Sequence, residues 1–327
     1  MKLGTAPPLS TLGFGAAAIG NLFTAVHDDD AEAAVFEAFH RGVRYFDTAP
    51  HYGCGLSERR LGRALGQLPG EGVVISTKVG RLLVSDGEAL AGEFAVSGRR
   101  SIFDYSRAGI MRSFESSLER LQRDRVDILL LHDVGRDTHG ALHDTMLKLA
   151  LDEALPAMAQ LKAMNACRAI GIGVNEEQVC LEIMARFDLD CILLAGRYTL
   201  LEQPSLNGVM AEAKRRGVEI IVGGPYNSGL LAGAHAPGDI YNYRPVDADT
   251  LKRARRIYEV CAAENVDVGA AALQFVLAHP AVVSVVPGMR SSAEVRSAAE
   301  RMRVKLPTSL WQSLRAARLL APGVPTP

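Results

Sequence analysis

The sequence has few of the features that mark a disulfide-rich, membrane-bound or nucleic-acid-binding protein. Its five cysteines are scattered, odd in number and without a CxxC pair, so they indicate neither a disulfide scaffold nor a zinc knot. No apolar run approaches the ~18 residues that a membrane-spanning helix needs. The net charge is −1, with no basic run and no acidic tail. We therefore expect a cytoplasmic protein with free thiols and no nucleic-acid or membrane partner.

The N-terminal segment also lacks the uninterrupted apolar core of a signal peptide. It carries one early lysine, but Pro7, Pro8, Gly13 and Gly15 interrupt its apolar stretch. We expect this segment to belong to the mature protein.

What the chain does contain is an alternation of short β-rich runs and helical patterns. Its 327 residues, 48% of them hydrophobic, are ample for one large core. Several of the β-rich runs are continuously apolar, which is typical of parallel strands that are covered on both faces. The candidate strands are Thr11–Ala17, Val43–Asp47, Val73–Lys78, Ile128–His132, Ala169–Val174, Cys191–Ala195, Val218–Gly223 and Val282–Val286.

Amphipathic helical patterns lie between these strands, among them Ala31–Arg41, Ala108–Arg123 and Asp249–Glu264. Ser57 and Ser291 stand where helix N-caps are expected. Eight strands, each followed by a helix, favour an α/β protein built as a closed (β/α)8 TIM barrel, with residues 1–327 forming one domain.

An open doubly wound sheet is the competing fold. It usually places a G-x-G-x-x-G sequence after the first strand, and the spacing of Gly13, Gly15 and Gly20 does not match. In the barrel, Leu82–Ser106 and His235–Arg244 follow strands. We expect them as long loops on the face that carries active sites.

The segment Pro307–Leu320 has the pattern of one further helix beyond the eight barrel units. We expect it as an extra C-terminal helix.

Polar residues end three successive predicted strands. Asp47, Lys78 and His132 each follow an apolar run, and Tyr52 lies five residues after Asp47. Singly, each is more often a solvated or packed group, but the C-terminal ends of barrel strands converge on one face. There an ammonium beside a phenol is expected to lower the pKa of Tyr52 from ~10 toward working pH, with Asp47 keeping Lys78 charged. Such a site can move a proton on or off a hydroxyl while a hydride leaves or joins the same carbon.

Several motifs resemble those of the aldo-keto reductase family. The segment DTAPHYG at 47–53 is similar to the family's D-T-A-x-x-Y-G, and SERRLG at 57–62 to the S-E-x-x-L-G that follows it. STK at 76–78, LH at 131–132 and VPG at 286–288 resemble its lysine strand, its histidine strand and its late cofactor loop. The matches run in order over nearly the whole chain.

The resemblance implies an NAD(P)-dependent oxidoreductase. It implies Tyr52 as the general acid or base, Lys78 and Asp47 as the pair that tunes it, and His132 as the residue that orients the substrate. No metal is expected, because His132 and Asp133 have no second His–carboxylate set with ligand spacing.

Finer detail resembles a sugar-oxidising branch of the family. The segments are TKVGRL at 77–82, FDYS at 103–106 and GGPYNSGLL at 223–231. The branch includes D-threo-aldose, L-fucose and L-galactose 1-dehydrogenases and also pyridoxal 4-dehydrogenase. The resemblance implies oxidation of the anomeric hydroxyl of an aldose to a lactone, by hydride transfer to nicotinamide with Tyr52 as the general base.

Other functions stay open at this point. A pyridoxal 4-dehydrogenase or a general aldehyde or ketone reductase would use the same fold. A non-catalytic binding barrel is disfavoured, because a pure binding module has no need for Lys78 beside Tyr52. The expected partner is a small sugar or aldehyde, and the sequence leaves open whether the chain forms a homo-oligomer.

The resemblance also implies a dinucleotide site. The residues expected to form it are Gly15, Ala16, Asn175, Tyr226, Asn227, Ser228, Gly288, Met289, Arg290 and Glu294. Glu294 favours NAD, because a carboxylate repels a 2′-phosphate and accepts hydrogen bonds from ribose hydroxyls. Arg290 argues for NADP, because it can pair with a phosphate. NAD is the preferred expectation.

Two positions depart from the family pattern. Ala195 stands where members carry a glutamine that holds the nicotinamide amide, and Gly223 where an aromatic ring often stacks on nicotinamide. Tyr226 either compensates for that ring or packs in the core.

For the substrate we expect Phe23, His51 and Asp133 to line the mouth of the barrel. His51 and Asp133 flank the expected catalytic residues and can bind sugar hydroxyls. Solvated loop positions are equally compatible with these three residues.

Overall fold

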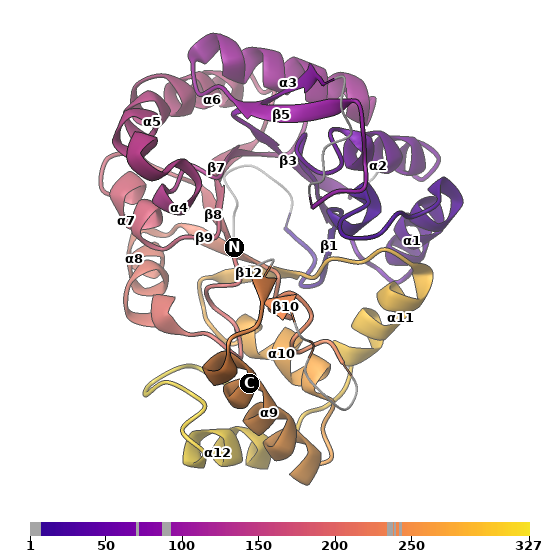
Figure 1. Ribbon diagram of the computed structural model, residues 1–327, viewed down its shortest axis with the longest axis vertical. Coiled ribbons are helices and arrows are strands. Elements are labelled where there is room, and N and C mark those ends of the chain that lie inside the picture. The colour runs from indigo at the N-terminus through magenta and orange to yellow at the C-terminus, as the bar shows by residue number, and fades with distance from the viewer. Residues whose placement is uncertain (1–7, 70–71, 87–92, 234–237, 239, 242–243) are drawn as a thin grey trace.

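The eight central strands form a closed parallel barrel. The computed structural model describes residues 8–69, 72–86, 93–233, 238, 240–241 and 244–327. The central sheet has the order β1-β2-β3-β6-β7-β8-β9-β12, and its neighbouring strands pair in parallel. Bridges from Leu12 to Val285 and from Gly15 to Gly288 join the first strand to the last, and helices surround the ring (Figure 1). The predicted (β/α)8 barrel is confirmed.

The ends of the barrel strands lie within two residues of the ends of the predicted runs. They are β1 (Gly13–Gly15), β2 (Tyr45–Asp47), β3 (Val74–Val79), β6 (Ile128–His132), β7 (Ala169–Val174), β8 (Cys191–Ala195), β9 (Glu219–Gly223) and β12 (Val282–Val286). Almost all of their residues are buried, because side chains fill the inside of the barrel and helices cover the outside.

The interior of the barrel holds its own cluster of apolar side chains. Its members include Tyr45 on β2, Val74 on β3 and Leu130 on β6. Since alternate residues of a strand share a face, the interior positions continue two or four residues later with Asp47 and Lys78. The apolar filling of the barrel therefore gives way to polar groups at the C-terminal end of these strands.

The helices that follow the barrel strands form the outer ring. They are α1 (Asp28–His40), α2 (Leu56–Gly66), α3 (Arg107–Leu121), α6 (Leu155–Ala163), α7 (Gln178–Met184), α8 (Val209–Arg216), α10 (Val268–Leu277) and α11 (Ser292–Arg301). Shorter helical segments are η1 (Ala18–Gly20), α4 (Arg136–His139), η2 (Gly140–Leu142), α5 (His143–Leu149), the π-helical η3 (Ala150–Ala154) and η4 (Pro204–Asn207).

The two serines that were predicted to be helix N-caps have different roles in the structure. Ser291 accepts a hydrogen bond from the Glu294 N–H and caps α11, as predicted. The prediction for Ser57 is wrong, because α2 begins after Gly55, whose φ of +85° suits glycine. Ser57 lies inside α2, and its hydroxyl donates to the Ala16 carbonyl at 2.7 Å.

Two helices follow β9, where the sequence pattern indicated one. The helix α9 (Ala248–Ala263) corresponds to the predicted Asp249–Glu264, and α10 was not predicted. Eight of the ten residues of α10 are buried, so it has no amphipathic stripe to signal a helix. The predicted C-terminal helix is confirmed as α12 (Thr308–Ala316), which packs against α9 at one end of the molecule (Figure 1).

The two long connections contain short antiparallel hairpins. In Leu82–Ser106, the strands β4 (Arg81–Ser85) and β5 (Arg99–Phe103) pair with each other, and residues 87–92 lie outside the described residues. In His235–Arg244, the strand β10 (Ile240–Tyr241) pairs with β11 (Arg244–Pro245), and residues 234–237, 239 and 242–243 are likewise outside them. The first connection follows β3, and the second lies in the segment between β9 and the next helix.

Within the described part of the chain, no helix taken singly has both the length and the apolar character to cross a membrane. The pair α9 and α10 meets that test jointly, with a bend of 101° between the two helices.

Two glycines of α2 give a matched test of helix packing. A Cβ at Gly62 would lie 2.4 Å from the backbone oxygen of Leu121 in α3, whereas a Cβ at Gly66 would meet nothing within 4 Å. Gly62→Ala should therefore lower the free energy of unfolding by about 1–3 kcal/mol. Gly66→Ala should leave it unchanged or raise it by up to about 1 kcal/mol. Denaturant unfolding of both variants measures this, and equal effects would contradict the close approach of α2 and α3.

Candidate active site

Three strand ends and one loop bring the predicted tetrad together. Asp47 ends β2, Lys78 is the last residue but one of β3, and His132 ends β6. Tyr52 lies in the loop between β2 and α2, and its hydroxyl oxygen is 3.1 Å from the Lys78 ammonium nitrogen. The rings of Tyr52 and His132 meet edge to face, with centroids 6.0 Å apart.

The ammonium of Lys78 is fully buried, and hydrogen-bond acceptors are available for all of its protons. It donates to both carboxylate oxygens of Asp47, at 3.0 and 2.8 Å, and to the Thr48 carbonyl at 2.9 Å. Burial alone would lower the pKa of Lys78, but the Asp47 carboxylate and Tyr52 raise it above its ordinary value. A Cβ on Gly173 of β7 would lie 3.1 Å from the Lys78 Cε, so this glycine leaves the room that the lysine side chain occupies.

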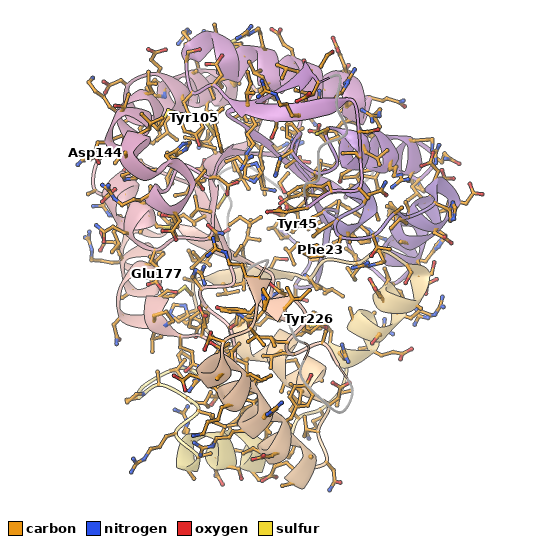
Figure 2. All side chains as sticks on the ribbon, in the orientation of Figure 1. Phe23, Tyr45, Tyr105, Asp144, Glu177 and Tyr226 are labelled. Carbon is orange, nitrogen blue, oxygen red and sulfur yellow. The ribbon has the colours of Figure 1, made fainter. Side chains whose placement is uncertain are left out.

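A chain of hydroxyls holds Asp47 from the other side. The Ser76 hydroxyl donates to Asp47 Oδ1 at 2.7 Å, and the Tyr45 hydroxyl lies 2.9 Å from the Ser76 oxygen. Since Ser76 has one proton and gives it to the carboxylate, Tyr45 is the donor in the second bond. Figure 2 shows Tyr45 near the centre of the barrel. Sequence reasoning missed this chain, although the alternation of strand residues puts Ser76 on the same face as Lys78.

The pKa of Tyr52 differs from the expectation. Burial raises the pKa of Tyr52 above its ordinary value, and the nearby Lys78 ammonium offsets only part of that rise. The sequence indicated the ammonium but not the depth of burial. In the structure Tyr52 is therefore a neutral phenol at physiological pH, suited to give a proton, and it must lose that proton before it can accept one.

His132 is also neutral. Burial lowers the pKa of His132 well below its ordinary value, and the charges of Arg81 and Lys78 lower it further. A neutral imidazole beside the phenol can donate or accept a hydrogen bond without adding charge to the site.

A groove of about 550 Å³ runs past Tyr52 toward the start of α11. Of the residues expected at the dinucleotide site, those that line it are Gly15, Tyr226, Ser228, Gly288, Met289, Arg290 and Glu294. Phe23, expected at the substrate mouth, also lines this groove and is about half exposed. Figure 2 shows Phe23 near the middle of the barrel and Tyr226 toward the side where α10 lies.

Three of the residues expected at the dinucleotide site lie outside the groove lining, namely Ala16, Asn227 and Asn175. Ala16 is fully buried, and its carbonyl accepts from Ser57. Asn227 is buried, and its side-chain amide lies 3.5 Å from the Gly196 carbonyl. Ala195 and Gly223, the two departures from the family pattern, both line the groove.

The groove has features that fit a dinucleotide. A Cβ at Gly288 would meet no atom within 4 Å, so this glycine leaves the wall of the groove open. The groove passes the N-terminus of α11, where the helix dipole favours negative groups. Arg301 and Ser297, further along α11, also line it and were not predicted.

A smaller pocket of about 270 Å³ adjoins the groove, and Tyr52 lines both. Its lining includes three expected residues, His51, Asp133 and Asn175, and also Lys78 and His132. Asn175 thus lies at the small pocket, and it is not part of the groove lining.

Three further residues of the small pocket were missed, namely Arg81, Glu93 and Phe94. The Phe94 ring stacks on the Tyr52 ring with centroids 6.0 Å apart, and Leu22 and Phe94 pair in an isolated antiparallel bridge. Arg81 lies two residues after the end of the lysine strand β3, a signal that sequence reasoning did not use. Phe94 comes from the middle of a long connection, where no local pattern marks it.

Among the residues that the structure describes, no group of three or more His, Cys, Asp or Glu side chains has a geometry that holds a metal ion.

Known proteins resemble this chain in sequence over nearly its full length. The model of the aldo/keto reductase family matches residues 11–318. A D-threo-aldose 1-dehydrogenase of Pseudomonas sp is 40% identical, with 98% of this chain and 96% of that protein covered. A pyridoxal 4-dehydrogenase of Microbacterium luteolum is 36% identical, with 96% and 95% covered. An L-galactose dehydrogenase of Arabidopsis thaliana is 31% identical, with 88% and 82% covered.

Solved structures agree with this in three dimensions. The holo form of an aldo-keto reductase from Bacillus halodurans superposes with a TM-score of 0.74 at 26% identity, covering 99% of this chain and 97% of that one. A glycerol dehydrogenase from Gluconobacter oxydans, at 21% identity and a TM-score of 0.73, shares the fold over 100% and 98% of the two chains.

The pKa of Tyr52 gives a direct test of the site's electrostatics. In the protein without cofactor, Tyr52 should ionise above its ordinary value because burial disfavours the phenolate. The difference in ultraviolet titration between the wild type and Tyr52→Phe isolates this group. Lys78→Met should raise the pKa of Tyr52 further, since it removes the ammonium that favours the phenolate. Ionisation below the ordinary value of 10.0 would contradict the burial seen here.

Proposed function

The chain belongs to the aldo/keto reductase family and is an NAD(P)-dependent oxidoreductase, and from that premise we propose that it oxidises the anomeric hydroxyl of an aldose to a lactone, with Tyr52 as the general base. The observation that carries the proposal is the position of Tyr52. Its hydroxyl lies 3.1 Å from a buried ammonium and borders both the long groove and the small pocket. A relative named for D-threo-aldose, 40% identical over nearly the whole chain, supports the choice of substrate.

The lining of the small pocket suits a sugar. Hydrogen-bonding side chains of His51, Asp133 and Asn175 lie on its walls. Apolar surface is supplied by Phe94 and Leu193. A pyranose has hydroxyls around its rim and C–H groups on its faces, so polar walls and an aromatic surface together match both kinds of group.

The proton leaves through Tyr52. Oxidation of the anomeric carbon removes a hydride from C1 and a proton from the C1 hydroxyl. When bound, nicotinamide supplies the acceptor for the hydride. The phenolate of Tyr52 accepts the proton, and the Lys78 ammonium at 3.1 Å stabilises that phenolate before the transfer. Asp47 keeps the ammonium charged and fixed in place.

His132 orients the substrate oxygen. Its ring lies edge-on to Tyr52 and lines the same pocket. Because this imidazole is neutral, it can donate a hydrogen bond to the oxygen of C1 without competing with Tyr52 for the proton. Two groups thus approach one oxygen from different directions, which fixes its position.

The start of α11 supports NAD as the preferred cofactor. Glu294 accepts a hydrogen bond from the Arg290 backbone N–H at 2.8 Å, and its carboxylate lies 3.5 Å from the Arg290 guanidinium. The carboxylate therefore already occupies the positive end of the helix and partly neutralises the arginine. A 2′-phosphate arriving there would meet a like charge, whereas ribose hydroxyls would meet an acceptor.

Pyridoxal is the second candidate substrate. The pyridoxal 4-dehydrogenase of Microbacterium luteolum is 36% identical over nearly all of both chains. The stacked rings of Phe94 and Tyr52 offer a flat aromatic surface at the pocket, which suits a pyridine ring as well as the face of a sugar.

Tyr52→Phe tests the mechanism. We expect turnover to fall by at least about 10²-fold, the usual contribution of general acid–base catalysis, while cofactor binding measured by fluorescence stays nearly unchanged. Tyr258→Phe is the matched control, because it removes a hydroxyl that bonds to the carbonyls of Leu230 and Gly233 away from the pocket. The assay is reduction of NAD and NADP with L-fucose, L-galactose, D-arabinose and pyridoxal. Full activity of Tyr52→Phe would reject the mechanism, and turnover of pyridoxal alone would reject the sugar.

Glu294→Gln tests the choice of cofactor. The amide keeps an acceptor for the α11 cap but removes the charge that faces a 2′-phosphate. The preference for NAD over NADP, as a ratio of kcat/KM, should fall by about fivefold, in line with an exposed charge worth ~1 kcal/mol. Glu300→Gln on the same helix is the control and should leave the ratio unchanged. An unaltered ratio in Glu294→Gln would place the discrimination elsewhere.

A further inference from the structure

Arg81 lies at the start of β4, beside the small pocket but outside the tetrad. One of its guanidinium nitrogens, Nη2, donates to Asp133 Oδ2 at 2.5 Å. The other, Nη1, lies 3.4 Å from the Ser101 hydroxyl oxygen on β5. Its guanidinium also packs 4.1 Å from the centre of the Phe103 ring, which fixes the plane of the fork. Arginine can only donate hydrogen bonds, so both of its partners must accept.

The Ser101 branch leads to His51. The Ser101 oxygen lies 2.8 Å from His51 Nδ1. Because Ser101 accepts from Arg81, its single proton is free to go to His51, and His51 Nδ1 is then the unprotonated nitrogen. The remaining proton of the neutral ring sits on Nε2, which has no hydrogen-bond partner among the described residues. This arrangement gives Arg81 Nη1, the Ser101 hydroxyl and His51 Nδ1 compatible donor and acceptor roles.

The Asp133 branch leads to His132. The same Oδ2 that accepts from Arg81 lies 3.4 Å from His132 Nε2. His132 Nδ1 is buried, and within the described structure it has no partner. A proton on Nδ1 would be a buried donor without an acceptor, which is unfavourable. The proton of the neutral ring therefore belongs on Nε2, where the carboxylate can accept it.

The carboxylate of Asp133 is held in place by more than Arg81. Its backbone has φ +52°, an uncommon conformation for a residue with a side chain, and its N–H bonds to the Gly173 carbonyl at 3.0 Å. The distance of 3.4 Å to His132 Nε2 is longer than a good hydrogen bond. The Nε2 proton thus stays available to an oxygen that enters the pocket.

From these contacts we propose that Arg81 is a positioning residue that fixes the tautomers of both His51 and His132, so that each presents a proton on Nε2 to the substrate pocket. Arg81 acts on His51 through the Ser101 hydroxyl, which donates to Nδ1. It acts on His132 through the Asp133 carboxylate, which accepts from Nε2. Both histidines stay neutral, since burial lowers the pKa of His51 to about 3 and that of His132 well below its ordinary value. The tautomers follow from contacts within the chain, and only their effect on turnover rests on the proposed function.

The test is long-range proton–nitrogen NMR of the histidine rings at neutral pH in the full chain without cofactor, with His51→Gln and His132→Gln assigning the signals. In the wild type both rings should show a protonated Nε2 and an unprotonated Nδ1. Arg81→Met should turn both rings into mixtures of tautomers. Ser101→Ala should affect His51 alone. Asp133→Gly, which suits the positive φ, should affect His132 alone.

Two further variants sharpen the result. Arg81→Lys keeps the charge but lacks the fork, so it should preserve the His132 tautomer through Asp133 and lose that of His51. Arg112→Met removes an exposed arginine that pairs with Asp104 at 2.8 Å, and it should change neither ring. A protonated Nδ1 on either wild-type ring would overturn the proposal, and so would an Arg81→Met spectrum identical to that of the wild type.

Activity adds a second readout. With a substrate from the panel that the wild type turns over, Arg81→Met should lower kcat/KM by about tenfold, as for the loss of one hydrogen bond to substrate. Cofactor binding should be unchanged, because Arg81 does not line the long groove. If the wild type oxidises none of the sugars, the proposed function fails while the NMR result still decides the role of Arg81. Altered tautomers with unaltered kcat/KM would reject their importance for turnover.

Discussion

The buried ammonium of Lys78 is the constraint on which the site depends. A cation without exposure is stable only when a carboxylate and hydrogen-bond acceptors surround it, because desolvation otherwise favours its neutral form. Asp47 and Lys78 lie on neighbouring strands, where Asp47 pairs in register with Ser76 and Lys78 follows two residues later on the same face. A slip of one residue between β2 and β3 would turn the ammonium away from its carboxylate. The chemistry of the site therefore requires this register between β2 and β3.

This coupling explains why the tetrad could be predicted from the sequence. A polar residue that ends a continuous apolar run, as at Asp47 and His132, is placed by the direction of its strand alone. Closure of the barrel then brings such ends together without any knowledge of loops. The helix α10 was not predicted, because burial on nearly all sides removes the amphipathic pattern that marks a helix at the surface. Ser57 was wrongly predicted to be a helix N-cap. Its hydroxyl instead donates a hydrogen bond to the Ala16 carbonyl, 41 residues away.

The small pocket was harder to predict, because its walls come from contacts between distant segments. Arg81 meets Asp133 across 52 residues, and Phe94 reaches Tyr52 from within a long connection. No local periodicity encodes such pairs. The pKa of Tyr52 was hard to predict for a similar reason. The neighbouring ammonium can be inferred from the sequence, but the depth of burial is a property of the folded chain. What remains hidden from the sequence is how the loops cover the mouth of the barrel.

The distribution of charge at this mouth bears on the substrate. Apart from Glu93, which also lines the pocket, the charged residues that the structure describes in its lining belong to two couples, Lys78 with Asp47 and Arg81 with Asp133. The groups that border the pocket between them, the phenol of Tyr52 and the two imidazoles, are held neutral by burial. A charged phosphate or carboxylate on a substrate would have to break one of these couples to gain a partner, at the cost of leaving the other member uncompensated. An uncharged polyol or pyridine alcohol needs only the exposed donors and acceptors, so the electrostatics of the pocket favour a neutral substrate.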